Sequence, residues 1–104
     1  MKAHTVRYSK LAVQDLERVW NEVFEASQND EITRNYIDAL MDKIETKAEF
    51  PKSGAPLYYE DAFTGYYYVA FKKYIGFYRV ESETIFVDRV LFAASDYLRI
   101  LHID

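Results

Sequence analysis

The chain has 104 residues, 50% of them hydrophobic, and a formal net charge of −4. This length is typical of one domain, and we expect a single domain over residues 1–104. The absence of cysteine excludes disulfides, thiolate metal ligands and thiol nucleophiles. No apolar stretch approaches the ~18 residues that a membrane span requires, so we expect a cytoplasmic protein without membrane contact.

The distribution of charge disfavours generic nucleic-acid binding. Acidic residues equal or outnumber basic residues in residues 1–30, 31–63 and 64–104. A protein that binds phosphates normally carries a basic excess, because counterion release supplies most of its non-specific affinity. No segment of the chain has such an excess.

The first elements are a short strand and a helix. Residues Thr5–Tyr8 alternate with strand-forming types, and Ser9 is a suitable N-cap for the helix that follows. The helix is expected to end near residues 27–29, where short polar side chains compete for the backbone. Its apolar residues recur at helical spacing: Ala12, Leu16, Val19, Trp20, Val23 and Phe24.

A second helix follows almost at once. Asn29 or Asp30 can cap it, and Pro51 disfavours helix at Phe50, so the helix is expected to close there. With so short a connection the two helices form an antiparallel hairpin. The apolar residues of the second helix are Ile37, Leu40, Met41, Ile44 and Ala48.

After Pro56 the pattern changes to the period of two that strands require. Three runs predict strands joined by tight hairpins, at Tyr66–Phe71, Tyr74–Val80 and Thr84–Leu91, and Leu57–Glu60 is a candidate fourth. Residues Ser95–His102 predict a short helix, with Ser95 as its cap. The expected fold class is α+β: a short N-terminal strand and a helical hairpin packed on a small antiparallel sheet of 3–5 strands, with a short C-terminal helix.

Most standard catalytic arrangements are absent from the sequence. There is no glycine-rich phosphate loop and no nucleophile elbow. His4 and His102 lie at opposite ends of the chain and share no metal-ligand spacing. We therefore expect no metal site and no cofactor. Four helical carboxylates are expected on solvated faces: Asp15, Glu22, Asp38 and Asp42.

The strand half contains two distinctive sets of side chains. Tyr66, Tyr67 and Tyr68 are consecutive, so their phenols must point to both faces of the sheet, and we expect at least one to be exposed. They are either strand formers that pack on neighbours or a contact surface. A small cationic set, which Glu81 and Asp88 can neutralise, consists of Lys72, Lys73, Arg79, Arg89 and Arg99.

Four stretches, in this order, suggest a family. They are Tyr8-Ser9-x-x-Ala12-x-x-Asp15-Leu16, Phe50-Pro51-x-x-Gly54, Lys73-Tyr74-x-x-Phe77-Tyr78-Arg79-Val80, and Asp88-Arg89-Val90-Leu91 followed by Asp96-Tyr97-Leu98-Arg99-Ile100-Leu101. With them the chain resembles the RelE/ParE superfamily of bacterial type II toxin–antitoxin toxins, also called plasmid stabilisation proteins. The fold of that family agrees with the pattern above.

The resemblance implies one of two activities. RelE-like members cut mRNA on the ribosome with basic side chains and a tyrosine, whereas ParE-like members inhibit DNA gyrase without catalytic residues of their own. Where mRNA-cutting members commonly have arginine after the strand tyrosine, this chain has Ile75, and Tyr67 occupies another basic position. Phosphoryl transfer needs cations where charge develops. We therefore expect a growth-inhibiting toxin that acts by binding, through ParE-like gyrase inhibition or as a degenerate member.

The alternative is a ribosome-dependent mRNA endoribonuclease. Its candidate catalytic residues are Tyr97, Arg89 and Arg79, with Lys72 and Lys73 in a rearranged site. Tyr97 is the residue that matches a position used in some members of the family.

The resemblance also implies partners. We expect a cognate antitoxin that keeps the toxin inactive, DNA gyrase or the ribosome as the target, and a homodimer or a hetero-oligomer with the antitoxin. An antitoxin helix or strand is expected to lie across the sheet edge and the helical hairpin. The candidate partner-binding residues are Tyr58, Tyr59, Phe63, Tyr66, Tyr67, Lys72 and Lys73.

Overall fold

The computed structural model describes residues 4–103, which form a five-stranded sheet and three α-helices. Along the chain the elements are β1 (Thr5–Tyr8), α1 (Lys10–Ser27), α2 (Asp30–Glu45), β2 (Ala55–Tyr59), β3 (Ala62–Phe71), β4 (Tyr74–Glu81), β5 (Thr84–Phe92) and α3 (Tyr97–Ile100). Two single 3₁₀ turns, Thr46–Ala48 and Pro51–Ser53, connect α2 to β2. Within the described residues no helix is both long and apolar enough to cross a membrane.

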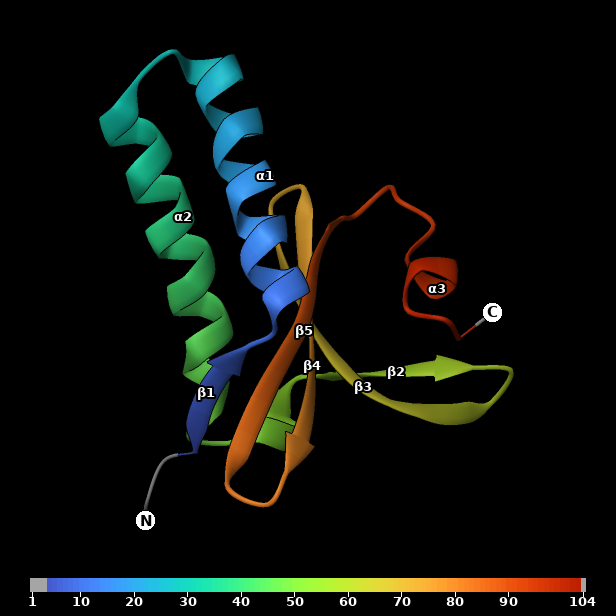
Figure 1. The fold of residues 1–104 in the computed structure, drawn as a ribbon. Coiled ribbons are helices and arrows are strands. Elements are labelled where there is room, and N and C mark those ends of the chain that lie inside the picture. Colours follow the sequence, from blue (N-terminus) through green and yellow to red (C-terminus); the bar gives the residue numbers. More distant parts are fainter. Residues whose placement is uncertain (1–3, 104) are drawn as a thin grey trace.

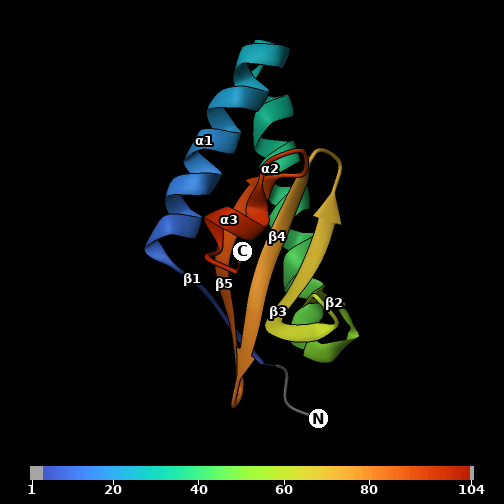
Figure 2. The same ribbon diagram turned by 90° about the vertical axis from the view of Figure 1, so that its right-hand side faces the viewer.

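The sheet lies between the helical hairpin and the C-terminal helix. Its strand order is β1-β5-β4-β3-β2, with β1 parallel to β5 and all other neighbours antiparallel. Figures 1 and 2 show α1 and α2 on one face and α3 on the opposite face. The expected α+β architecture is confirmed, but the sheet is mixed rather than wholly antiparallel, since β1 runs parallel to β5.

Ser9 caps α1 as the sequence predicts, and of the two candidate caps for α2, Asn29 and Asp30, the structure has Asn29. The Ser9 side chain accepts a hydrogen bond from the Ala12 N–H at 2.9 Å, and Asn29 caps α2 through the Ile32 N–H at 2.9 Å. α2 ends at Glu45, earlier than predicted, because the chain tightens into the 3₁₀ turn Thr46–Ala48.

The C-terminal helix is shorter than the sequence predicts. α3 begins at Tyr97, and Ser95 does not cap it. The Ser95 hydroxyl instead donates to the Phe92 carbonyl at 2.6 Å, where it closes the turn that leaves β5.

Each face of the sheet has its own apolar core. Beneath the helical hairpin the buried residues are Ala12, Val19, Leu40, Ile44, Val69, Tyr74, Tyr78, Ile85, Val87 and Val90. Beneath α3 they are Leu57, Phe77, Leu91 and Leu101. Burial of side chains on both faces stabilises the sheet and fixes its register, since a shift by one residue would exchange the two sets.

The three consecutive tyrosines divide between these cores, as predicted. Tyr67 stacks on Tyr78 beneath the helices, with ring centroids 5.5 Å apart, whereas Tyr66 and Tyr68 lie on the α3 face. All three residues are half-buried, and none is fully buried or fully exposed. α3 covers the second face, which the strand pattern alone could not show.

Candidate functional site

The open edge of β5 is completed by side chains of the first helix. β1 pairs with β5 only as far as Val87. Beyond that point the Ser9 hydroxyl donates to the Asp88 carbonyl at 2.7 Å. The two backbone groups of Val90 bind side chains of α1: its N–H donates to Asp15 at 2.9 Å, and its carbonyl accepts from Arg18 at 3.0 Å. The beginning of α1 thus replaces the missing strand.

Asp15 is the centre of this edge. It is only 2% exposed and accepts hydrogen bonds from Arg89 at 2.7 and 3.0 Å and from Arg18 at 2.9 Å. Burial would raise the pKa of its carboxyl, but the bonds from Arg89, Val90 and Arg18 outweigh burial and hold that pKa below its ordinary value. The prediction that Asp15 is solvated is wrong.

Arg79, the second candidate catalytic arginine, is also bound to carboxylates. Its Nε donates to Asp88 at 2.6 Å and its Nη1 to Glu81 at 2.9 Å. Its guanidinium carbon lies 5.6 Å from the centre of the Phe86 ring. The neutralisation by Asp88 and Glu81 that the sequence allowed is therefore present.

Tyr97, the candidate catalytic tyrosine, lies against the apolar core beneath α3. Its ring centroid is 5.2 Å from that of Phe77, which is buried together with Leu57, Leu91 and Leu101. The three candidate catalytic residues thus have different partners: Arg89 binds Asp15, Arg79 binds Asp88 and Glu81, and Tyr97 packs on Phe77.

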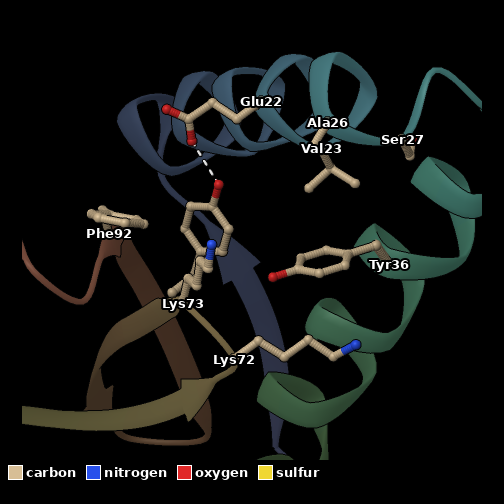
Figure 3. Close-up of a pocket in the computed structure, with 9 residues that line it drawn as sticks. Glu22, Val23, Ala26, Ser27, Tyr36, Lys72, Lys73 and Phe92 are labelled. Carbon is tan, nitrogen blue, oxygen red and sulfur yellow. Dashed lines mark hydrogen bonds between the residues drawn. The ribbon is translucent and has the colours of Figure 1, made fainter.

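A hollow of about 600 Å³ opens between the helical hairpin and the β3–β4 turn (Figure 3). We call it the lysine-rimmed hollow, because the two residues of that turn, Lys72 and Lys73, line one side of it. The full set of lining residues is Glu22, Val23, Ala26, Ser27, Tyr36, Lys72, Lys73, Tyr74 and Phe92. Most of this lining is aliphatic or aromatic, as in sites that take up an apolar group.

The polar groups of the lysine-rimmed hollow are few. The Tyr74 hydroxyl donates to Glu22 at 2.6 Å, and burial, followed by this bond, raises the pKa of Tyr74. The Lys72 amine lies 5.1 Å from the centre of the Tyr36 ring. Neither Lys72 nor Lys73 has a salt-bridge partner among residues 4–103. The hollow therefore offers two lysines without carboxylate partners, together with the Glu22 carboxylate, beside an apolar surface.

A second exposed feature is the β2–β3 hairpin, residues 55–65, which we call the aromatic hairpin. Tyr58 and Phe63 face each other across its strands and are 58% and 47% exposed. Their ring centroids are 5.9 Å apart, and Phe63 lies 5.3 Å from Tyr67. Tyr59, beside them on β2, is half-buried.

The structure places the seven candidate partner-binding residues in three regions. Tyr58, Tyr59 and Phe63 lie in the aromatic hairpin, and Tyr67 contacts Phe63 from the next part of β3. Lys72 and Lys73 line the hollow, and Tyr66 lies on the α3 face. Burial, then the nearby charge of Asp88, raises the pKa of the Tyr66 phenol. The sequence-based set omitted the hollow's Glu22, Tyr36, Tyr74 and Phe92, since nothing in their spacing indicates that α1, α2 and two strands meet there.

No group of three or more His, Asp and Glu side chains that could hold a metal ion occurs between residues 4 and 103. The chemical resources of the described surface are therefore aromatic rings, the two lysines of the hollow that lack carboxylate partners and the ion pairs of the β5 edge.

The fold is similar to those of solved toxin structures. A chain of the chromosomal ParDE TA system from P. aeruginosa is 13% identical, covers 86% of this chain and 96% of its own, and gives a TM-score of 0.71. A chain of the toxin-antitoxin complex RelBE2 from Mycobacterium tuberculosis is 23% identical, with coverages of 91% and 97% and a TM-score of 0.63. YafQ from E. coli strain BL21(DE3) is 17% identical, with coverages of 88% and 94% and a TM-score of 0.52.

The sequence itself carries the assignment of the family. A search of curated proteins found no match. Residues 6–97, however, match the family described as the ParE toxin of the type II toxin-antitoxin system, parDE. This range contains both long helices, all of β2–β5 and the start of α3. The chain therefore belongs to the family of ParE toxins of type II toxin–antitoxin systems.

Proposed function

We propose that this toxin inhibits growth by binding DNA gyrase, without cutting mRNA, and that a cognate antitoxin neutralises it. The observation that carries the proposal is that the candidate catalytic residues are occupied by contacts within the fold. Arg79 and Arg89 are each bound to carboxylates, and Tyr97 packs on Phe77. Each of the two arginines thus has its charge compensated within the fold.

Cleavage of an RNA strand would require the two arginines to be free to contact a phosphate. A phosphoryl-transfer site stabilises developing negative charge with preorganised cations, and loss of one such donor typically costs roughly 10²–10³ in rate. Release of Arg89 would leave Asp15 buried and charged without its main partner, at a cost of about 3–5 kcal/mol. A site built from Arg89 would therefore destabilise the fold that presents it.

The lysine-rimmed hollow supports binding of the antitoxin. Its apolar lining suits an inserted aliphatic or aromatic side chain, and Lys72 and Lys73 suit carboxylates beside that anchor. An amphipathic helix can supply both from neighbouring turns. We propose that an acidic, apolar segment of the antitoxin occupies this hollow.

The target is tested with purified components. We expect the purified toxin to inhibit DNA supercoiling by purified DNA gyrase, and addition of the antitoxin to restore it. Primer extension on mRNA after induction in cells is expected to show no new cuts. Codon-phased mRNA cuts, with supercoiling unaffected, would instead establish the endoribonuclease alternative.

The antitoxin site is tested by charge reversal. The double variant Lys72→Glu, Lys73→Glu is expected to bind the antitoxin at least roughly tenfold more weakly in a calorimetric titration. The matched control, Lys10→Glu with Lys52→Glu, changes the net charge equally at exposed positions outside the hollow. Equal loss of affinity in both variants would reject the hollow as the antitoxin site.

A further inference from the structure

The aromatic hairpin is a second exposed surface, and its shape sets it apart from the rest of the sheet. Its turn lies at the end of β3 opposite to the turn that carries Lys72. With the 10 residues of β3 between them, the two turns are ~30 Å apart. Figure 1 shows the hairpin projecting away from α1 and α2. A partner can therefore contact the hairpin without entering the lysine-rimmed hollow.

Aromatic rings connect the tip of the hairpin to the core. Tyr58 and Phe63 are partners in the β2–β3 register, Phe63 contacts Tyr67, and Tyr67 stacks on the fully buried Tyr78. The hydroxyl of Tyr78 donates to the Pro51 carbonyl, which fixes the inner end of this row. The exposed rings are thus held by the core, and binding them costs little side-chain entropy.

The charge of the hairpin is of one sign. Residues 55–65 include Glu60 and Asp61 but no lysine, arginine or histidine. Glu60 and Asp61 are the two residues of the turn, and their backbone φ angles are 49° and 68°. Asn-Gly is the favoured pair for such a turn, because both positions are left-handed. Here the turn instead presents two acidic side chains beside two exposed rings.

We propose that the aromatic hairpin contacts the toxin's protein target and binds arginine side chains of that target. A guanidinium can stack on the rings of Tyr58 and Phe63, and its N–H groups can bind the carboxylates of Glu60 and Asp61. A nucleic-acid strand does not fit, since its phosphates would be repelled by these carboxylates. This inference rests on the proposed function, because it assigns a surface to the target that the toxin binds.

The charge is tested with a variant that should fold better than the wild type. Glu60→Asn with Asp61→Gly removes both charges and installs the favoured turn. We expect its Tm to rise or stay unchanged, its antitoxin affinity to stay within about twofold, and its inhibition of purified gyrase to weaken by at least roughly tenfold. Growth arrest on induction without antitoxin should weaken in parallel.

The rings are tested separately. Tyr58→Ser with Phe63→Ser removes the exposed aromatic pair and leaves Tyr67 and the core in place. We expect the same loss of growth arrest with retained antitoxin binding, and the retained binding reports that the variant is folded. Filter binding to a DNA duplex should show no change, and a change there would favour a nucleic-acid partner and overturn the proposal.

The outcomes separate this inference from the proposed function. If the wild type arrests growth and both hairpin variants arrest growth equally well, the hairpin inference is wrong and the proposed function stands. If the hairpin variants lose growth arrest while wild-type toxin leaves gyrase unaffected, the hairpin contacts a target other than gyrase, and gyrase inhibition is wrong. A wild-type chain that does not arrest growth overturns both.

Discussion

Asp15 on α1 binds Arg89 on β5 through two hydrogen bonds of 2.7 and 3.0 Å, across 74 positions of sequence. The same carboxylate accepts the Val90 N–H, which has no strand partner beyond the end of β1. Asp15→Ala would leave a backbone donor and a half-buried guanidinium without their acceptor. We expect it to destabilise the protein by about 3 kcal/mol or more and to lower Tm by more than about 10 °C. Thermal unfolding followed by circular dichroism measures both.

The contribution of Asp15 depends on pH. Its pKa in the folded protein is lower than in the unfolded chain, where it is about 3.9. Its stabilisation is therefore fully present above about pH 4 and is lost as the pH falls through the folded-state pKa. Asp15→Asn lacks this ionisation, so the difference in unfolding free energy between wild type and variant should narrow in acid. If that difference in unfolding free energy stays constant from pH 7 to pH 2, the ionised Asp15 carboxylate does not stabilise the fold as we expect.

Ser9 makes a smaller contribution to the same edge. Its side chain caps α1 and also donates to the Asp88 carbonyl at 2.7 Å. Ser9→Ala removes both interactions, and we expect it to lower the free energy of unfolding by about 1–2 kcal/mol. Urea denaturation measures the loss. Ser53→Ala, at an exposed position, is the control and should be close to neutral.

The fold was predictable because its signals are local. The caps Ser9 and Asn29, the spacing of the apolar residues and the change of period after Pro56 mark the elements, and the structure confirms their order. The ends of α2 and α3 were not predictable, since they depend on the 3₁₀ turn Thr46–Ala48 and on the path of the chain after β5. Tertiary packing, which a local pattern does not contain, decides such boundaries.

The site was less predictable for the same reason. Asp15 lies three residues after Ala12 and four before Val19, both fully buried, so its helical position did indicate the buried face. What the sequence could not supply was Arg89 as its partner. The lysine-rimmed hollow depends on four elements that approach only in the folded chain, and Lys72 and Lys73 are the members of it that the sequence singled out.

Gly54 and Tyr78 form a second long-range pair. The Tyr78 hydroxyl donates to the Pro51 carbonyl, and burial raises the pKa of Tyr78 to about 12. A Cβ at position 54 would collide with that hydroxyl. We expect Gly54→Ala to cost about 1–3 kcal/mol and Tyr78→Phe about 1–2 kcal/mol.

The two substitutions should not be additive. Tyr78→Phe removes the atom nearest to the new methyl group, so Gly54→Ala is expected to cost about 1 kcal/mol less in the Tyr78→Phe background. Urea denaturation of the wild type, the two single variants and the double variant gives the four unfolding free energies of this double-mutant cycle. Strict additivity would show that the cost of Gly54→Ala arises elsewhere in the turn after Pro51.

Tyr97→Phe separates binding from cleavage with the smallest change to the fold. The ring that packs on Phe77 remains, and the hydroxyl that a nuclease would use is removed. If the toxin acts by binding, we expect growth arrest, supercoiling inhibition and antitoxin affinity to equal those of the wild type within about twofold. As an essential acid or base, the hydroxyl would supply roughly 10²–10⁴ of the cleavage rate, and growth arrest would largely disappear. Dose–response curves for growth after graded induction, at matched protein levels on immunoblots, distinguish these results, and retained antitoxin binding shows that the variant is folded.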